Sequence, residues 1–146
     1  MRMRHGSTLA AALLIAVVLT SGCGGSPGTA ATGVAGDGTI VTTEKDFGIA
    51  LEETSTPAGS TTFDIANDGP STHEFVVFKT DLAEDTLPVD GSTVTEGNLD
   101  LVDEVEDIAP GVGTSLTVDL EPGSYVVICN VEGHYTAGMH AALTVT

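Results

Sequence analysis

The chain has 146 residues, of which 21 are acidic and only four are lysine or arginine, giving a formal net charge of −17 at pH 7. This length suits a single domain with a substantial buried core. A surface this acidic cannot bind nucleic acid by neutralising phosphates, and anionic lipid head groups would repel it. We therefore expect no nucleic-acid partner, and we expect any partner protein attracted by charge to present a cationic face.

The N-terminus has the pattern of an export signal. Arg2 and Arg4 precede an unbroken apolar run over residues 9–19, which is too short to span a bilayer as a helix. The run ends in the motif L-T-S-G-C, which resembles a bacterial lipobox with threonine in the usual place of leucine. We expect residues 1–22 to be a lipoprotein signal peptide and Cys23 to be acylated. Lipid would then anchor the protein to the membrane outside the cytoplasm, at the bacterial cell surface or in the periplasm. An ordinary secretory signal cut nearby is the alternative.

Residues 23–38 are rich in glycine, alanine, threonine and serine, which predicts a flexible tether. Lipid on Cys23 would leave Cys129 as a single cysteine in an oxidising compartment, without a disulfide partner. A bare thiol is vulnerable there unless a metal or another group occupies it.

Residues 39–146 have the pattern of an all-β domain with almost no helical periodicity. Apolar residues alternate around Phe47–Ile49–Leu51, Phe63–Ile65 and residues 114–120, as in strands with one buried face. Residues 75–78 and 125–128 are continuously apolar, as in central strands covered on both faces. Residues 141–146 form the last expected strand, and Pro and Gly turns separate the segments. We predict an antiparallel β-sandwich or barrel of about eight strands.

Residues 80–107 carry ten acidic side chains and no basic one, interrupted by Pro88, Gly91 and Gly97. We interpret this segment as a long insertion with a short helix, followed by an edge strand over residues 99–105. A solvated acidic loop is the simplest interpretation. A docking surface and a weak divalent-ion site are alternatives, although the segment lacks the pattern of a calcium-binding loop.

Cys129, His134 and Met139 lie in the run C-N-V-E-G-H-Y-T-A-G-M, with four residues between successive members. A glycine directly precedes both His134 and Met139, so the chain can turn back towards the sulfur. His73 opens one central strand and can lie beside Cys129, which ends another. A thiolate, two imidazoles and a thioether suit a type 1 copper centre, although zinc also accepts sulfur and imidazole. An accidental cluster in an immunoglobulin-like structural module is the alternative.

Neighbouring residues have expected supporting roles. The backbone N–H of Glu74 is a candidate donor to the sulfur, and Asn130 either ties the loop down or is a plain turn residue. We expect His134 to lie nearest to solvent, and His140 to be structural or exposed rather than a ligand. The ring of residues expected around His134 is Gly133, Tyr135, Ala137 and Gly138.

Together these residues resemble the cupredoxins, the plastocyanin/azurin family of small blue copper proteins, over residues 39–146. The loop spacing is most similar to the sulfocyanin and rusticyanin branches. The resemblance implies a Greek-key sandwich and one type 1 copper per chain, held by His73, Cys129, His134 and Met139. Glu74 departs from the family, which often has at this position, directly after the first histidine, a polar amide that tethers the loop.

The resemblance also implies single-electron transfer by Cu(II)/Cu(I) cycling between respiratory-type redox partner proteins, with no small-molecule substrate. The partners would dock through a cationic or apolar face. A copper sequestration or delivery protein for a cuproenzyme is the alternative function. We do not expect an enzyme, because copper oxidases and nitrite reductases need further histidines for a second copper, and His140 alone is spare.

Overall fold

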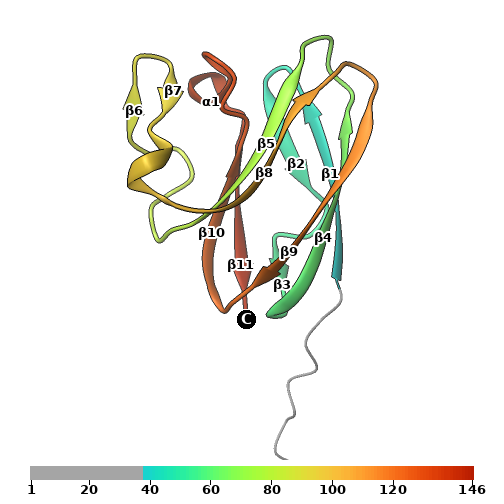
Figure 1. Ribbon diagram of the computed structural model, residues 1–146, viewed down its shortest axis with the longest axis vertical. Helices are drawn as coiled ribbons and strands as arrows, with labels where there is room; N and C mark the ends of the chain where they lie inside the picture. The colour runs from blue at the N-terminus through green and yellow to red at the C-terminus, as the bar shows by residue number, and fades with distance from the viewer. Residues whose placement is uncertain (1–37) are drawn as a thin grey trace, which may run out of the picture. The chain divides into compact units, whose positions relative to one another are not determined.

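A computed structural model describes residues 38–146 (Figure 1). The predicted signal peptide, the acylation at Cys23 and nearly all of the tether lie outside the described residues. The described part contains eleven strands, a 3-10 helix and a one-turn α-helix. In chain order these are β1 (Gly38–Lys45), β2 (Gly48–Leu51), β3 (Ser55–Thr56), β4 (Gly59–Asn67), β5 (His73–Lys79), β6 (Val89–Asp90), β7 (Thr93–Val94), η1 (Glu96–Asn98), β8 (Asp100–Ile108), β9 (Gly113–Leu120), β10 (Gly123–Ile128), α1 (His134–Ala137) and β11 (His140–Val145).

The strands form two facing sheets and a small hairpin (Figure 1). One sheet has the order β2-β1-β4-β9, the other has the order β3-β11-β10-β5-β8, and β6 pairs with β7. The prediction of an all-β sandwich is therefore confirmed. The expectation of purely antiparallel pairing is wrong at two places, because β1 runs parallel to β4 and β3 runs parallel to β11. The chain leaves β2, pairs as β3 with the other sheet and then returns as β4, so β4 re-enters beside β1 in the same direction.

The main core lies between the sheets and is built by the alternating residues of both. Phe63 on β4 and Phe75 on β5 meet at its centre, with ring centroids 5.1 Å apart. Strands β5 and β10 are buried on both faces, as their continuous apolar runs predict, because a second cluster covers their outer side. The fully or nearly buried members of the main core are Ile40, Phe63, Ile65, Phe75, Val77, Ile108, Leu116, Val118, Leu120, Tyr125, Val127, Leu143 and Val145.

The acidic segment over residues 80–107 is more than a solvated loop. Its Leu87 and Val94 are buried against Val76, Phe78 and Val126 on the outer face of the five-stranded sheet. The expected edge strand is present as β8, which lies at the end of that sheet, and the expected short helix is η1. No helix within residues 38–146 has the length and apolarity needed to cross a bilayer.

Phe47 does not lie on the buried face expected from its alternation with Ile49 and Leu51. The β1–β2 register pairs Lys45 with Gly48, so Asp46 and Phe47 form the turn between the strands. The alternation therefore begins only in β2, and the Phe47 side chain remains 54% exposed. This turn lies at the same end of the sandwich as the predicted metal ligands, and it contacts them.

Candidate metal centre

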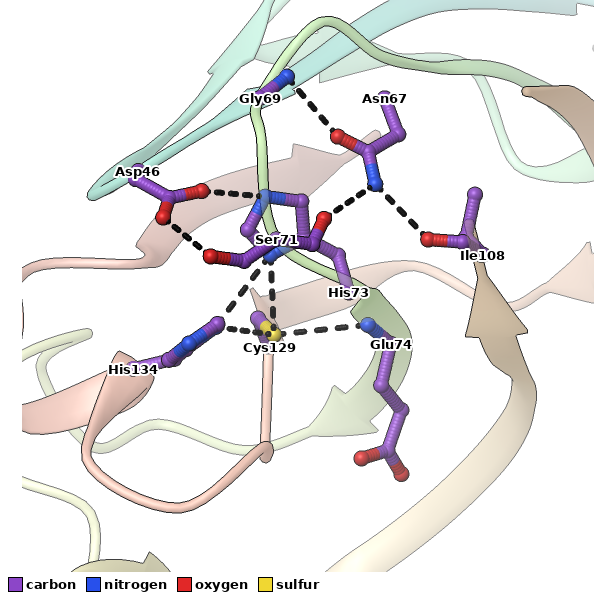
Figure 2. A network of polar contacts seen from close by, with 9 residues as sticks. All are labelled: Asp46, Asn67, Gly69, Ser71, His73, Glu74, Ile108, Cys129 and His134. Atoms are coloured by element: carbon purple, nitrogen blue, oxygen red, sulfur yellow. Dashed lines mark hydrogen bonds and ion pairs between the residues drawn. The ribbon is translucent and has the colours of Figure 1, made fainter. Parts of the chain in front are cut away.

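Three side chains that the sequence predicts as ligands meet at one end of the sandwich (Figure 2). The Nδ1 atoms of His73 and His134 are 3.2 Å apart, and Cys129 Sγ lies 3.3 Å from His134 Nδ1 and 3.8 Å from His73 Nδ1. His73 and Cys129 are fully buried, while His134 is 9% exposed. As expected, His134 is therefore nearer to solvent than the other two.

Strand pairing brings His73 and Cys129 together. Strands β5 and β10 are antiparallel neighbours in which Val76 pairs with Ile128. His73 is the first residue of β5 and Cys129 directly follows β10, so both lie at the same end of these two neighbouring central strands. The ladder fixes both backbones, and the two side chains are placed by the sheet rather than by a mobile loop.

The loop after Cys129 is closed by backbone hydrogen bonds. Cys129 N–H donates to the Met139 carbonyl at 3.0 Å, and Met139 N–H donates to the His134 carbonyl at 3.1 Å. Gly133 and Gly138 have φ angles of 83° and 117°, in the left-handed region that favours glycine. The two turns carry the chain through α1 and back to Cys129, and they leave the Met139 side chain fully buried.

The electrostatics of the pocket favour a bound cation over a free thiolate. Burial raises the pKa of Cys129 to about 11, although the backbone N–H groups of Val131 and Glu74 oppose the rise. The Glu74 N–H lies 3.4 Å from the sulfur, so the contact expected from the sequence is present. Burial lowers the pKa of His73, which keeps its imidazole in the neutral form that binds metals.

The donor spacing fits one metal ion. Two imidazole nitrogens and a sulfur spread in a plane about 2.0–2.3 Å from one ion lie roughly 3.5–3.8 Å from each other. The observed separations of 3.2, 3.3 and 3.8 Å agree within a few tenths of an ångström. The thiolate excludes hard cations as preferred occupants, and the planar set of two imidazoles and one thiolate is the arrangement used for type 1 copper.

The β1–β2 turn contributes one contact to each histidine, and sequence reasoning missed both. Asp46 Oδ1 lies 3.1 Å from His73 Nε2, and Asp46 Oδ2 accepts a 2.5 Å hydrogen bond from Ser71 Oγ (Figure 2). The Ser71 hydroxyl is the main reason that the pKa of Asp46 is lowered. Phe47 packs edge-on against the His134 ring, with centroids 5.3 Å apart. The only sequence signal was an acidic and an aromatic residue at a point where two strands can turn.

The turn predicted at residues 67–70 closes over the centre. The buried Asn67 amide donates to the carbonyls of Ser71 and Ile108 at 2.8 and 2.7 Å, and its oxygen accepts from Gly69 N–H at 2.9 Å. A Cβ atom on Gly69 would lie 2.7 Å from Asp46 Oδ1 and 2.8 Å from His73 Nε2. Only glycine leaves room for the chain to pass over this pair without displacing it.

Asn130 connects the loop over residues 129–139 to the acidic segment, so it is more than a plain turn residue. Its Oδ1 accepts from Val94 N–H at 2.6 Å, and its Nδ2 donates to the Val94 carbonyl at 3.2 Å and to Glu96 Oε1 at 2.6 Å. Glu96 also belongs to a group of three carboxylates with Glu74 and Glu104. Burial, followed by repulsion from these acidic neighbours, raises the pKa of Glu74 to about 7.

Tyr135 does not belong to the solvent-exposed ring expected around His134. Its side chain is buried in the outer cluster, where its hydroxyl accepts from Leu87 N–H at 2.8 Å and donates to the Glu84 carbonyl at 3.0 Å. The physical reason is that the acidic segment supplies an apolar surface and two backbone partners that outcompete water. His140 lies outside the donor group, packs against Tyr135 and has its Nδ1 3.7 Å from Glu84 Oε1.

The chain matches one protein-family model and shares its fold with several solved structures. A family model described as copper binding proteins of the plastocyanin/azurin family matches residues 39–146. An auracyanin from the photosynthetic bacterium Roseiflexus castenholzii is 22% identical, with a TM-score of 0.52, and the match covers 75% of this chain and 96% of that one. An azurin from Methylomonas sp. strain J is 19% identical, with a TM-score of 0.55, and the match covers 74% of this chain and 97% of that one.

A rusticyanin from Thiobacillus ferrooxidans is 16% identical, with a TM-score of 0.58, and the match covers 77% of this chain and 79% of that one. At these identities the solved structures show a shared fold. No curated protein sequence matches the chain. The family model spans most of the chain, and the described residues hold a His–Cys–His group suited to one type 1 copper ion. The chain therefore belongs to the plastocyanin/azurin family of copper-binding proteins, the cupredoxins.

Proposed function

We propose that this protein is a type 1 (blue) copper protein that carries single electrons, with His73, Cys129, His134 and Met139 as the metal ligands. The observation that carries this proposal is the convergence of two imidazole nitrogens and one sulfur within 3.2–3.8 Å of each other. Copper would supply the one-electron couple Cu(II)/Cu(I). The protein residues hold the ion, exclude water from it and connect it to the surface.

The rigidity of the pocket supports electron transfer. Exchange of an electron is fast when the oxidised and reduced ion accept nearly the same ligand positions. His73 and Cys129 are fixed by the ladder between β5 and β10, and the loop is closed on Cys129 through Met139. Such a frame would impose one compromise geometry on both valences of a bound copper ion, and the Met139 thioether, the Glu74 N–H and the exclusion of water would set its reduction potential.

Burial of the ligands favours a carrier over a protein that delivers or sequesters copper. Handing copper to another protein requires ligands that the partner can reach, whereas here three of the four side chains are fully buried and His134 is only 9% exposed. We expect the copper-loaded protein to cycle reversibly in voltammetry and to retain copper in a mild chelator. Rapid loss of Cu(I) to the chelator, together with irreversible cycling, would instead support delivery.

Electrons should enter and leave at the His134 edge. The exposed Phe47 ring packs edge-on against this histidine. The exposed Ala137 and the half-buried Gly138 follow it in the same loop, and together these residues offer a small apolar surface next to a metal ligand. We infer that redox partner proteins dock there through an apolar or cationic face, since the chain is strongly acidic.

We expect Ala137→Lys to slow electron exchange with the physiological partner while leaving the visible copper spectrum unchanged. A lysine at this position would place a hydrated charge in the contact without touching a ligand. Stopped-flow exchange rates measure the effect, and Ser115→Lys gives the same charge change on an exposed part of β9. Equal rates for both variants would argue against this docking site.

We also propose that the protein acts outside the cytoplasm, attached to the membrane by lipid on Cys23. The sequence supports this location through the signal pattern of residues 1–22, and a tether over residues 23–38 would allow the domain over residues 39–146 to reach its partners. Membrane fractionation of the wild type and of Cys23→Ser tests the anchor. Retention of the variant in the membrane fraction would exclude acylation at this residue as the attachment.

A further inference from the structure

Asp46 contacts the ring nitrogen of His73 that faces away from the donor group. We propose that Asp46 is a positioning residue for the metal, whose carboxylate orients the His73 ring and stabilises Cu(II) relative to Cu(I). This inference rests on the proposed function, because it concerns the properties of the copper ion that the centre would hold. Figure 2 shows the two contacts of His73, with Nδ1 towards Cys129 and His134 and Nε2 towards Asp46.

The pairing of these two groups is enforced by burial. Asp46 Oδ1 and His73 Nε2 lie 3.1 Å apart, and both atoms are inaccessible to solvent. Neither has an aligned hydrogen bond to any group within residues 38–146. The two atoms are therefore close enough to interact but lack the alignment of a linear hydrogen bond, so the carboxylate acts on the neutral ring mainly through its charge. Each atom is the available polar partner for the other.

Three further features hold the carboxylate against the ring. Asp46 lies in a two-residue turn whose flanking residues, Lys45 and Gly48, are paired across β1 and β2. Ser71 Oγ donates to the other carboxylate oxygen, which fixes the rotation of the carboxyl group. Gly69 passes so close that a Cβ atom there would overlap both Asp46 Oδ1 and His73 Nε2. These three features together keep the Asp46 carboxylate next to His73 Nε2.

A carboxylate facing the second nitrogen of His73 should strengthen copper binding, and it should do so more for Cu(II) than for Cu(I). A histidine that ligates through one nitrogen and faces a carboxylate with the other is a stronger donor, and loss of such a partner typically lowers metal affinity about 10–100-fold. The negative charge favours the doubly charged ion more than the singly charged one, and the exclusion of water from Asp46 Oδ1 and His73 Nε2 strengthens this effect. Reduction of a bound copper ion would take one electron from the redox partner, and it would require no proton transfer by Asp46 or His73.

We expect Asp46→Asn to weaken Cu(II) binding about tenfold more than Cu(I) binding, which raises the reduction potential by about 59 mV for a one-electron couple. Asp68→Asn is the matched control, because it removes the same charge from an exposed carboxylate that faces Lys45 at 3.9 Å instead of a histidine. Potentials from spectroelectrochemical titration measure both. Equal potentials for the two variants would overturn the proposal.

Gly69→Ala tests the contact without removing the charge. The added methyl group must displace the carboxylate or the ring, so we expect the potential to rise in this variant as well. In the Cu(I)-loaded wild type, the His73 Nε2 proton should exchange slowly with water in proton NMR and should shift in Asp46→Asn. A wild type without a blue copper spectrum would refute the proposed function itself. A blue wild type whose potential is unaffected by Asp46→Asn and Gly69→Ala would refute only the role of Asp46.

Discussion

Substitution of Cys129 by serine should abolish the intense sulfur-to-copper charge-transfer band that we expect when Cu(II) is added to the wild-type protein. A serine hydroxyl does not ionise to a soft anionic ligand at neutral pH, so the two imidazoles would be left without the thiolate that selects copper. Any Cu(II) that remains bound should show the paramagnetic spectrum of nitrogen and oxygen coordination. Visible and electron-paramagnetic spectra, recorded for the wild type and the variant at the same protein and copper concentrations, measure this loss.

The chain supplies its own control for this experiment. Cys23→Ser makes the same change at the other cysteine of the chain, and it should keep the band in full. Cys129 is the only cysteine in the described residues, and it is buried, so a band that depends on it reports on the centre itself. A band that survives in Cys129→Ser, or that never forms in the parent, would contradict a type 1 site.

The course of the loop over residues 129–139 was predictable because its geometry is local. Cys129, His134 and Met139 are separated by short stretches, and the two glycines before the second and third of them allow the required turns. His73 was predictable for a different reason. Two continuously apolar segments indicate central strands, and antiparallel neighbours in a sheet bring the start of one strand to the end of the other, as β5 and β10 do.

The contacts around the ligands were not predictable, because they depend on register and on packing between distant segments. The alternation of Phe47, Ile49 and Leu51 carries no information on where the β1–β2 turn closes, so the pattern placed Phe47 in a strand. The parallel pairs depend on a change of sheet at β3, which leaves no mark on hydropathy. Tyr135 is buried in the outer cluster, where its hydroxyl accepts a hydrogen bond from the N–H of Leu87, 48 residues away along the chain.

Glu44 is an acidic side chain on the buried face of β1. Ile40, Thr42 and Glu44 alternate along β1, and all three side chains point to the buried side of the strand. Glu44 is fully buried, and neither carboxylate oxygen has a hydrogen-bond partner within residues 38–146. Burial, with a smaller contribution from Glu74, raises the pKa of Glu44 from 4.5 to about 8. The folded protein therefore holds this carboxyl protonated at neutral pH.

The stability of the copper-free protein should consequently fall as the pH rises from about 4.5 to about 8. Below this range the carboxyl is protonated in both the folded and the unfolded chain, so its ionisation adds no pH-dependent penalty. Within the range the unfolded chain releases the proton and the folded chain retains it, which favours unfolding by up to 1.36 kcal/mol per pH unit. Above about pH 8 the full penalty is present, on the order of 3–5 kcal/mol for a displacement of the pKa from 4.5 to about 8.

We expect Glu44→Gln to remove this penalty, so that the variant unfolds at higher urea concentration than the wild type at pH 8 and at a similar concentration at pH 4. The amide has nearly the shape of the protonated carboxyl but does not ionise. Urea unfolding of copper-free protein between pH 4 and pH 9 measures the difference, and Glu53→Gln makes the same change at an exposed position after β2. Because other titrating groups affect the wild type and the variant alike, the quantity to compare is the difference in unfolding free energy between them. The prediction would be wrong if the difference in unfolding free energy between Glu44→Gln and the wild type did not grow with pH, or if it grew equally for Glu53→Gln. The pKa of Glu44 would then not be raised in the folded protein.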